Sequence, residues 1–123
     1  MTLIEAISQV NVAKPNGYTQ SEKTRWLSIL DGTVKAEIID THEGAEGIAF
    51  DGYDDNTDIQ TELLIPYPFD DIYVRWLEMQ IDYTNGEYSK YNNSKTMFNE
   101  AYSAFENYYN RHHMPIGKKF KFF

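Results

Sequence analysis

The sequence predicts an all-α fold, a small helical bundle with a long acidic loop and an extended C-terminal arm. One observation is that apolar and aromatic residues recur three and four positions apart through residues 69–111, which is the spacing of an amphipathic helix face. A second is that prolines bracket this stretch, with Pro66 and Pro68 before it and Pro115 after it. Because proline disfavours helix at the preceding residue, helices are expected to begin and end at these borders.

Two helices are expected in the N-terminal third of the chain. Thr2 can cap a short helix over residues 2–10, and the turn signal Pro-Asn-Gly at 15–17 ends it. Thr19 opens a Thr-x-x-Glu capping box, so a second helix is predicted over residues 20–39. The apolar face of this second helix carries residues four apart: Trp26, Leu30, Val34 and Ile38.

Two further helices are predicted over residues 70–91 and 94–111. An Asn-Gly pair at 85–86 is a turn signal, but the apolar stripe continues past it to Tyr91. We therefore predict that the first of these helices runs through the Asn-Gly pair. The break is expected at Asn92-Asn93, with Ser94 capping the last helix.

Residues 41–62 are predicted to form a long, exposed acidic loop, because helical periodicity stops there. No Lys or Arg occurs between Lys35 and Arg75, so the carboxylates of this region are unopposed in sequence. Within it, residues 47–50 and 62–65 are short and apolar enough to pair as a small β-hairpin.

A single helical domain is expected over residues 1–115, followed by a basic aromatic arm at 116–123. The 123 residues, 41% of them hydrophobic, can bury one modest core. After Pro115, alternation of Phe and Lys favours an extended arm over a helix. The chain also has ten Tyr, seven Phe and two Trp. Such residues suit contacts with protein partners, and they equally suit the seams between helices.

Composition narrows the class of protein further. The chain has no cysteine, which excludes disulfides and thiolate metal sites. Its N-terminus lacks the basic start and apolar core of a signal peptide, and no apolar run is long enough to cross a membrane. We expect a soluble protein made in a reducing cytosol, with no membrane partner.

No catalytic, cofactor or metal site is expected. Residues 51–62 begin with Asp and end with Glu, as a calcium-binding EF-hand loop does, but Tyr53 occupies a ligand position and Asn56 replaces the required glycine. The three histidines lack the spacing of a zinc site, and no phosphate loop or nucleophile elbow occurs. A calcium-binding regulator therefore stays a minor alternative, and enzyme activity is not expected.

Several segments together resemble the head-to-tail connector proteins, the adaptor or head-completion family, of tailed bacteriophages and prophages of Gram-positive bacteria. They are TQSEKTRWLSIL at 19–30, LLIPYP at 63–68, YVRWLEMQIDYTNGE at 73–87 and YNNSKTMFNEAYSAFENYYNR at 91–111. The resemblance implies an all-helical subunit of a ring, typically twelvefold, at the neck of the virion. Such a ring lies between the portal and a stopper or tail-completion protein, and DNA passes through it during packaging and ejection.

Three sets of residues would serve such a connector. The arm expected to dock on the portal or another partner comprises Lys118, Lys119, Phe120, Lys121, Phe122 and Phe123. The acidic residues expected to line the lumen or meet the next ring are Glu43, Glu46, Asp51, Asp54, Asp55 and Asp58. The candidates for contacts between subunits are Trp76, Tyr83, Tyr102, Tyr108 and Tyr109. An acidic lumen would repel the phosphate backbone and let the duplex slide.

An alternative of another class is an acidic protein-binding module, such as a phage inhibitor that mimics DNA with its carboxylates. It predicts a monomer or dimer that binds a basic host protein through carboxylates spaced along a rigid surface. The glycines and missing helical period of residues 43–58 argue against that arrangement.

Overall fold

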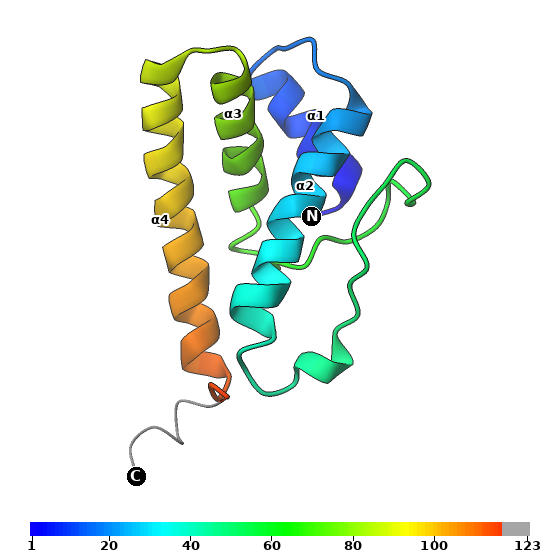
Figure 1. Ribbon diagram of the computed structural model, residues 1–123, viewed down its shortest axis with the longest axis vertical. Helices are drawn as coiled ribbons and strands as arrows, with labels where there is room; N and C mark the ends of the chain where they lie inside the picture. The colour runs from blue at the N-terminus through cyan, green and yellow to red at the C-terminus, as the bar shows by residue number, and fades with distance from the viewer. Residues whose placement is uncertain (117–123) are drawn as a thin grey trace.

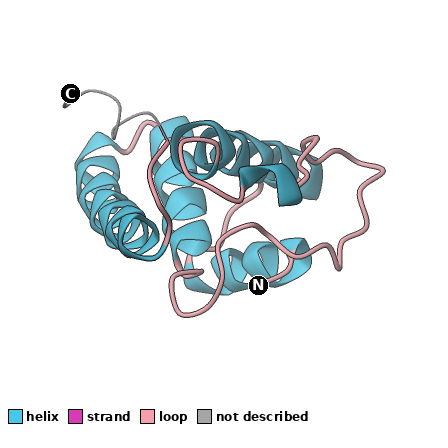
Figure 2. Ribbon diagram, turned by 90° about the horizontal axis from the view of Figure 1, so that it is seen from below, coloured by secondary structure: helices cyan, strands magenta, loops and turns pink. Residues whose placement is uncertain are grey.

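The computed structural model describes residues 1–116, which form four α-helices and no β-strand (Figures 1 and 2). Helix α1 spans Leu3–Ala13 and α2 spans Gln20–Val34, which continues into a π-helical turn, η1, at Lys35–Ile39. After a 3-10 turn, η2, at Ala45–Gly47, helices α3 and α4 span Ile72–Thr84 and Tyr88–His112. The predicted all-α bundle is confirmed at this level. No helix in the described residues is both long and apolar enough to span a bilayer.

Both predicted N-terminal caps are confirmed. The Thr2 hydroxyl accepts a hydrogen bond from the Glu5 N–H at 3.2 Å, while the Glu5 carboxylate accepts one from the Thr2 N–H at 2.9 Å. Thr19 and Glu22 form the same reciprocal pair at the start of α2. Each box satisfies N–H groups that have no partner within the helix, so these starts are set by local sequence.

The predicted break at Asn92-Asn93 is wrong, because the chain reverses at the Asn-Gly pair instead. Gly86 takes a left-handed φ of 73°, and the N–H groups of residues 85–87 bond the last carbonyls of α3 at 2.9–3.0 Å. A three-residue turn then lets α4 run back along α3 (Figure 1). The two apolar stripes bury each other in this way, which one continuous helix to Tyr91 could not do. Ser94 is no cap, since its hydroxyl donates to Asp82 at 2.5 Å.

Helix α3 forms the centre of the bundle, with α1 and α2 on one side and α4 on the other (Figure 1). Its inward side chains Ile72, Tyr73, Leu77 and Ile81 are completely buried. From α2 and η1 the core receives Leu27, Leu30, Val34, Ile38 and Ile39, and from α4 it receives Phe98, Phe105 and Tyr109. Because α4 packs only through one face, its opposite face remains at the surface.

The β-hairpin expected between 47–50 and 62–65 does not form. Residues 59–63 instead lie along the start of α1, where the N–H groups of Leu3 and Ile4 donate to the carbonyls of Thr61 and Ile59 at 3.0 Å. Thr2 and Glu62 form an isolated antiparallel bridge there. The first N–H groups of a helix need partners outside it, and this segment supplies them.

A buried carboxylate on α2 attaches the long connection between η1 and α3 to the bundle. Asp31 is fully buried, and its Oδ2 accepts hydrogen bonds from the Tyr53 hydroxyl at 2.5 Å and the Leu64 N–H at 3.1 Å. Its Oδ1 accepts one from the Tyr73 hydroxyl at 2.7 Å, and that hydroxyl in turn accepts one from the Ile65 N–H at 2.7 Å. Burial raises the pKa of Asp31, and burial beside this carboxyl group raises the pKa of both tyrosines.

Replacing Tyr73 by Phe tests this network. The change removes one hydrogen bond to Asp31 and leaves the N–H of Ile65 without its acceptor, so we expect a loss of roughly 2–4 kcal/mol in the free energy of unfolding. Urea unfolding followed by circular dichroism measures it. Tyr88→Phe, at an exposed side chain on α4, is the control and should change stability by less than about 0.5 kcal/mol. Equal stability of both variants would contradict the role of the network.

Replacing Gly86 by Ala tests the reversal between α3 and α4. A Cβ at this position would meet nothing within 4 Å, so Gly86→Ala should act through the left-handed φ alone. We expect it to lower the free energy of unfolding by about 1–2 kcal/mol. Gly17→Ala is a matched control, because its Cβ also meets nothing within 4 Å and its φ is outside the left-handed region. A loss of stability in both variants, or in neither, would show that the backbone at residue 86 is not the constraint.

Candidate functional site

The six acidic candidates all lie on the connection between η1 and α3, and every one of them is exposed. Two of these side chains also shape the backbone: Asp54 accepts from the Asn56 N–H and Asp58 from the Gln60 N–H, each at 2.9 Å. Within residues 1–116, no three His, Asp or Glu side chains lie close enough together to hold a metal ion. The exposed carboxylates make the surface of this connection acidic.

The connection carries these carboxylates on a backbone that is bonded to the bundle. The N–H of Tyr53 donates to the Ser28 hydroxyl at 2.9 Å, and the hydroxyl of the same residue donates to Asp31. Gly52, with a φ of 89°, lies so close to α2 that a Cβ would come within 3.2 Å of the Ser28 oxygen. Asp51 and Asp54, which flank this point of attachment, thus project from a fixed segment.

Of the candidates for subunit contacts, Tyr83 is the most exposed, with 57% of its surface accessible. It lies at the end of α3, where its ring centroid is 6.2 Å from that of Tyr88 and 5.2 Å from that of Tyr91. Tyr88 is 62% exposed. An aromatic edge of Tyr83, Tyr88 and Tyr91 is therefore presented beside the reversal between α3 and α4.

The other four candidates are half-buried or buried and contact other residues of the bundle. The indole N–H of Trp76 donates to the Trp26 carbonyl at 2.7 Å, and its ring packs on Phe98. The hydroxyl of Tyr102 donates to Glu37 at 2.9 Å, and its pKa is raised by burial and by that carboxylate. The two remaining rings pack α4 against the long connection: Tyr108 on Phe69, and Tyr109, which is 7% exposed, on His42.

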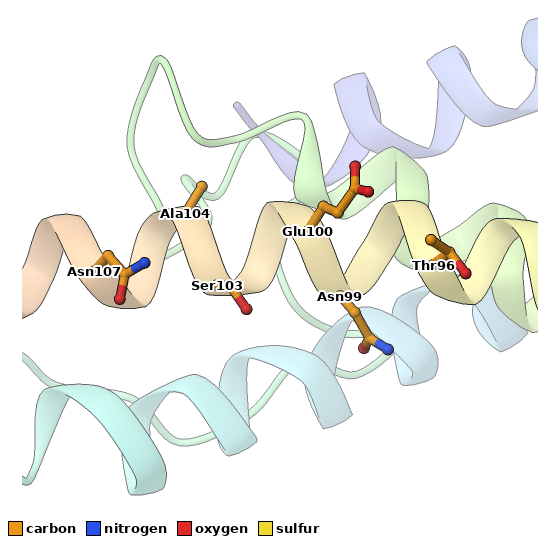
Figure 3. A pocket seen from close by; sticks show the side chains of 6 residues that line it. All are labelled: Thr96, Asn99, Glu100, Ser103, Ala104 and Asn107. Atoms are coloured by element: carbon orange, nitrogen blue, oxygen red, sulfur yellow. The ribbon is translucent and has the colours of Figure 1, made fainter.

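The outer face of α4 is a long surface on which small polar side chains predominate, with charged side chains at Lys90 and Glu100. An open, shallow depression on it is lined by Thr96, Asn99, Glu100, Ser103, Ala104 and Asn107, which Figure 3 shows along one side of the helix. Ser89, Asn92 and Asn93 extend this exposed face toward the start of α4. Small side chains let another helix approach closely, and amides can donate or accept hydrogen bonds.

A buried histidine joins the end of η1 to the end of α4. His42 is 4% exposed, with its Nε2 at 2.7 Å from the Asn110 Oδ1 and its Nδ1 at 2.5 Å from the Ile38 carbonyl. Its ring packs edge-on against Tyr109, which stacks on His113. The Tyr109 hydroxyl is buried without a hydrogen-bond partner among the described residues, and burial raises its pKa.

Three buried polar residues that organise these surfaces were missed at the level of sequence. Asp31 and His42 each follow a buried apolar residue of α2 or η1 by four positions, so helical spacing could have placed them on the inner face. Asp82 is also buried, where it bonds Lys14 at 2.6 Å and Ser94 at 2.5 Å. An acidic residue or histidine three or four positions from a buried apolar residue of the same helix was the sequence feature that could have indicated burial.

The predicted docking arm, Lys118 to Phe123, lies outside the described residues. The last described residue, Ile116, donates its N–H to the Thr41 carbonyl at 2.7 Å. The arm therefore continues from a point that is held against the end of η1.

Comparison with known proteins adds no relative from which a function could be transferred. No family model, no curated protein and no solved structure matches this chain. The functional argument consequently rests on the surfaces described above and on the sequence segments that resemble phage connectors.

Proposed function

We propose that this chain is a structural subunit of a head-to-tail connector of a tailed bacteriophage. Copies would assemble as a ring between the portal and the stopper or tail-completion protein, in the neck of the virion. The observation that carries this proposal is the division of the exposed surface into a long face on α4, on which small polar side chains predominate, and a separate connection bearing exposed carboxylates. A ring that encloses DNA needs both a lateral contact and a surface that does not hold the duplex.

The outer face of α4 is the proposed lateral contact. A ring is built from heterologous contacts, in which one patch of a subunit meets a different patch of the next. The 25 residues of α4 span about 38 Å, and depletion of charge is typical of the centre of protein interfaces. The aromatic edge at Tyr83 and Tyr88 supplies the large rings that such contacts favour.

The acidic connection is proposed to face the bore of the ring or the next ring. Phosphates of a passing duplex would be repelled by the exposed carboxylates of Glu43, Glu46, Asp51, Asp54, Asp55 and Asp58. Such repulsion keeps non-specific binding weak, which suits a conduit. The arm at 118–123, with three Lys and three Phe, is proposed to dock on the portal.

Deleting residues 117–123 tests the arm. The four helices and the core side chains described above all belong to residues 1–116, so the truncated chain should keep its helical circular dichroism and lose head-tail joining. The assay supplies full-length or truncated chain to heads made without it, adds tails and counts joined particles by electron microscopy. A full-length variant with Arg25→Ala, at an exposed position on α2, provides a control for loss of a basic side chain elsewhere. Normal joining by the truncated chain would refute the proposed docking role.

Introducing charge and bulk on α4 tests the lateral contact. Ser103→Arg with Asn107→Arg should abolish rings on portal-bearing heads, because both side chains lie on the proposed contact. Both are exposed, so stability should change by less than about 0.5 kcal/mol per site. Ser8→Arg with Gln9→Arg, at exposed positions on α1, is the matched control and should leave rings intact. Rings of normal appearance with the α4 variant would exclude this face as the contact.

A further inference from the structure

A groove runs between α2 with η1 on one side and α4 on the other. It consists of two adjoining hollows of about 240 and 310 Å³ that share Glu37. Leu30, Thr33, Glu37 and Thr41 line one wall, and Asn99, Tyr102, Glu106 and Asn110 line the other. Each set is spaced by three, four and four residues; the second set is one face of α4, and the first follows α2, η1 and the turn after η1. Along α4, from Phe98 to Asn110, the groove is about 18 Å long.

The lining of this groove is aromatic at one end and acidic along its length. Trp76, Phe98 and Tyr102 line the hollow farther from the end of α4. Glu37 and Glu106 contribute carboxylates, and among residues 1–116 no Lys or Arg lines either hollow. The bond from Tyr102 to Glu37 at 2.9 Å crosses from one wall to the other and holds that carboxylate in the groove. A ligand that matches this lining carries aromatic rings and positive charges in alternation.

The chain itself supplies such a sequence at the mouth of the groove. Ile116 lines the nearer hollow, where its N–H is bonded to Thr41. The seven residues that follow, 117–123, contain three Lys and three Phe and no acid. Fully extended, seven residues reach about 23 Å, which exceeds the length of the groove.

We propose that the groove binds the chain's own C-terminal segment, residues 117–123, in the isolated subunit. Phe side chains would rest on the aromatic end, and Lys side chains would pair with Glu37 and Glu106. The inference does not rest on the connector role. If that role is right, docking on another protein must displace the segment from its own groove, so the arm would be available only where a partner competes for it.

Paramagnetic relaxation in the full-length chain tests this directly. The chain has no cysteine, so Phe123→Cys gives a single site for a nitroxide spin label. Within residues 117–123 the change keeps all three Lys and two of the three Phe. We expect the amide signals of Thr33, Glu37 and Asn99 to lose most of their intensity. Signals of Ser8 and Gln9 on α1 should keep theirs and serve as an internal reference.

A charge-matched pair of variants tests the chemistry of the groove. Glu37→Gln with Glu106→Gln removes both carboxylates, retains an acceptor for Tyr102, and should restore the lost intensities. Glu46→Gln with Glu100→Gln removes the same charge from exposed positions outside the groove and should restore none. Restoration by both pairs would show attraction to net charge alone and would overturn the proposal.

Two further outcomes would also overturn it. One is full intensity at Thr33, Glu37 and Asn99 in the spin-labelled chain. The other is an equal loss of intensity when isotope-labelled chain without a spin label is mixed with an excess of spin-labelled chain that carries no isotope label, because the occupant would then be a second copy. Neither outcome depends on a phage assay, so failure here is distinguishable from failure of the connector proposal.

Discussion

The buried carboxylate of Asp31 is the contact on which the placement of the long connection depends. A charge removed from water is tolerated only with partners, and Asp31 obtains them from Tyr53 and Leu64 on the connection and from Tyr73 on α3. The connection has almost no regular structure of its own. Its position against α2 therefore comes from this network and from the backbone bonds to the start of α1.

Fixing the connection on one side of α2 has consequences for the surface. Its inner side chains complete the core, whereas its acidic side chains remain in solvent. On the opposite side of the bundle, α3 covers one face of α4 and leaves the other uncovered (Figure 1). Two chemically different surfaces thus arise from one core, and the connector proposal assigns a separate task to each of them.

Local signals in the sequence were sufficient for the starts of α1 and α2, for a helical segment over residues 20–39 and for the overall class. Thr2 and Thr19 cap their helices through bonds within three residues, so no tertiary information is needed. The turn at Gly86 was mispredicted because the helical spacing of apolar residues continues past it to Tyr91, which favoured one helix. Two antiparallel helices that pair their apolar faces explain the same spacing, and the left-handed φ of Gly86 allows the reversal between them. Asp31 and His42 escaped prediction because their partners are distant in sequence, in the connection, α3 and α4. The groove at Glu37 likewise exists only once Glu37 of η1 is brought next to Tyr102 of α4.

The central claim is that this chain forms a ring in the phage neck, and the most direct test is cryo-electron microscopy of completed particles. The account predicts a closed ring below the portal into which residues 1–116 fit as one bundle per subunit. The outer face of α4 should meet the neighbouring subunit, and residues 43–58 should face the bore or the next ring. A neck whose density is fully explained by other proteins, with this chain absent, would contradict the claim.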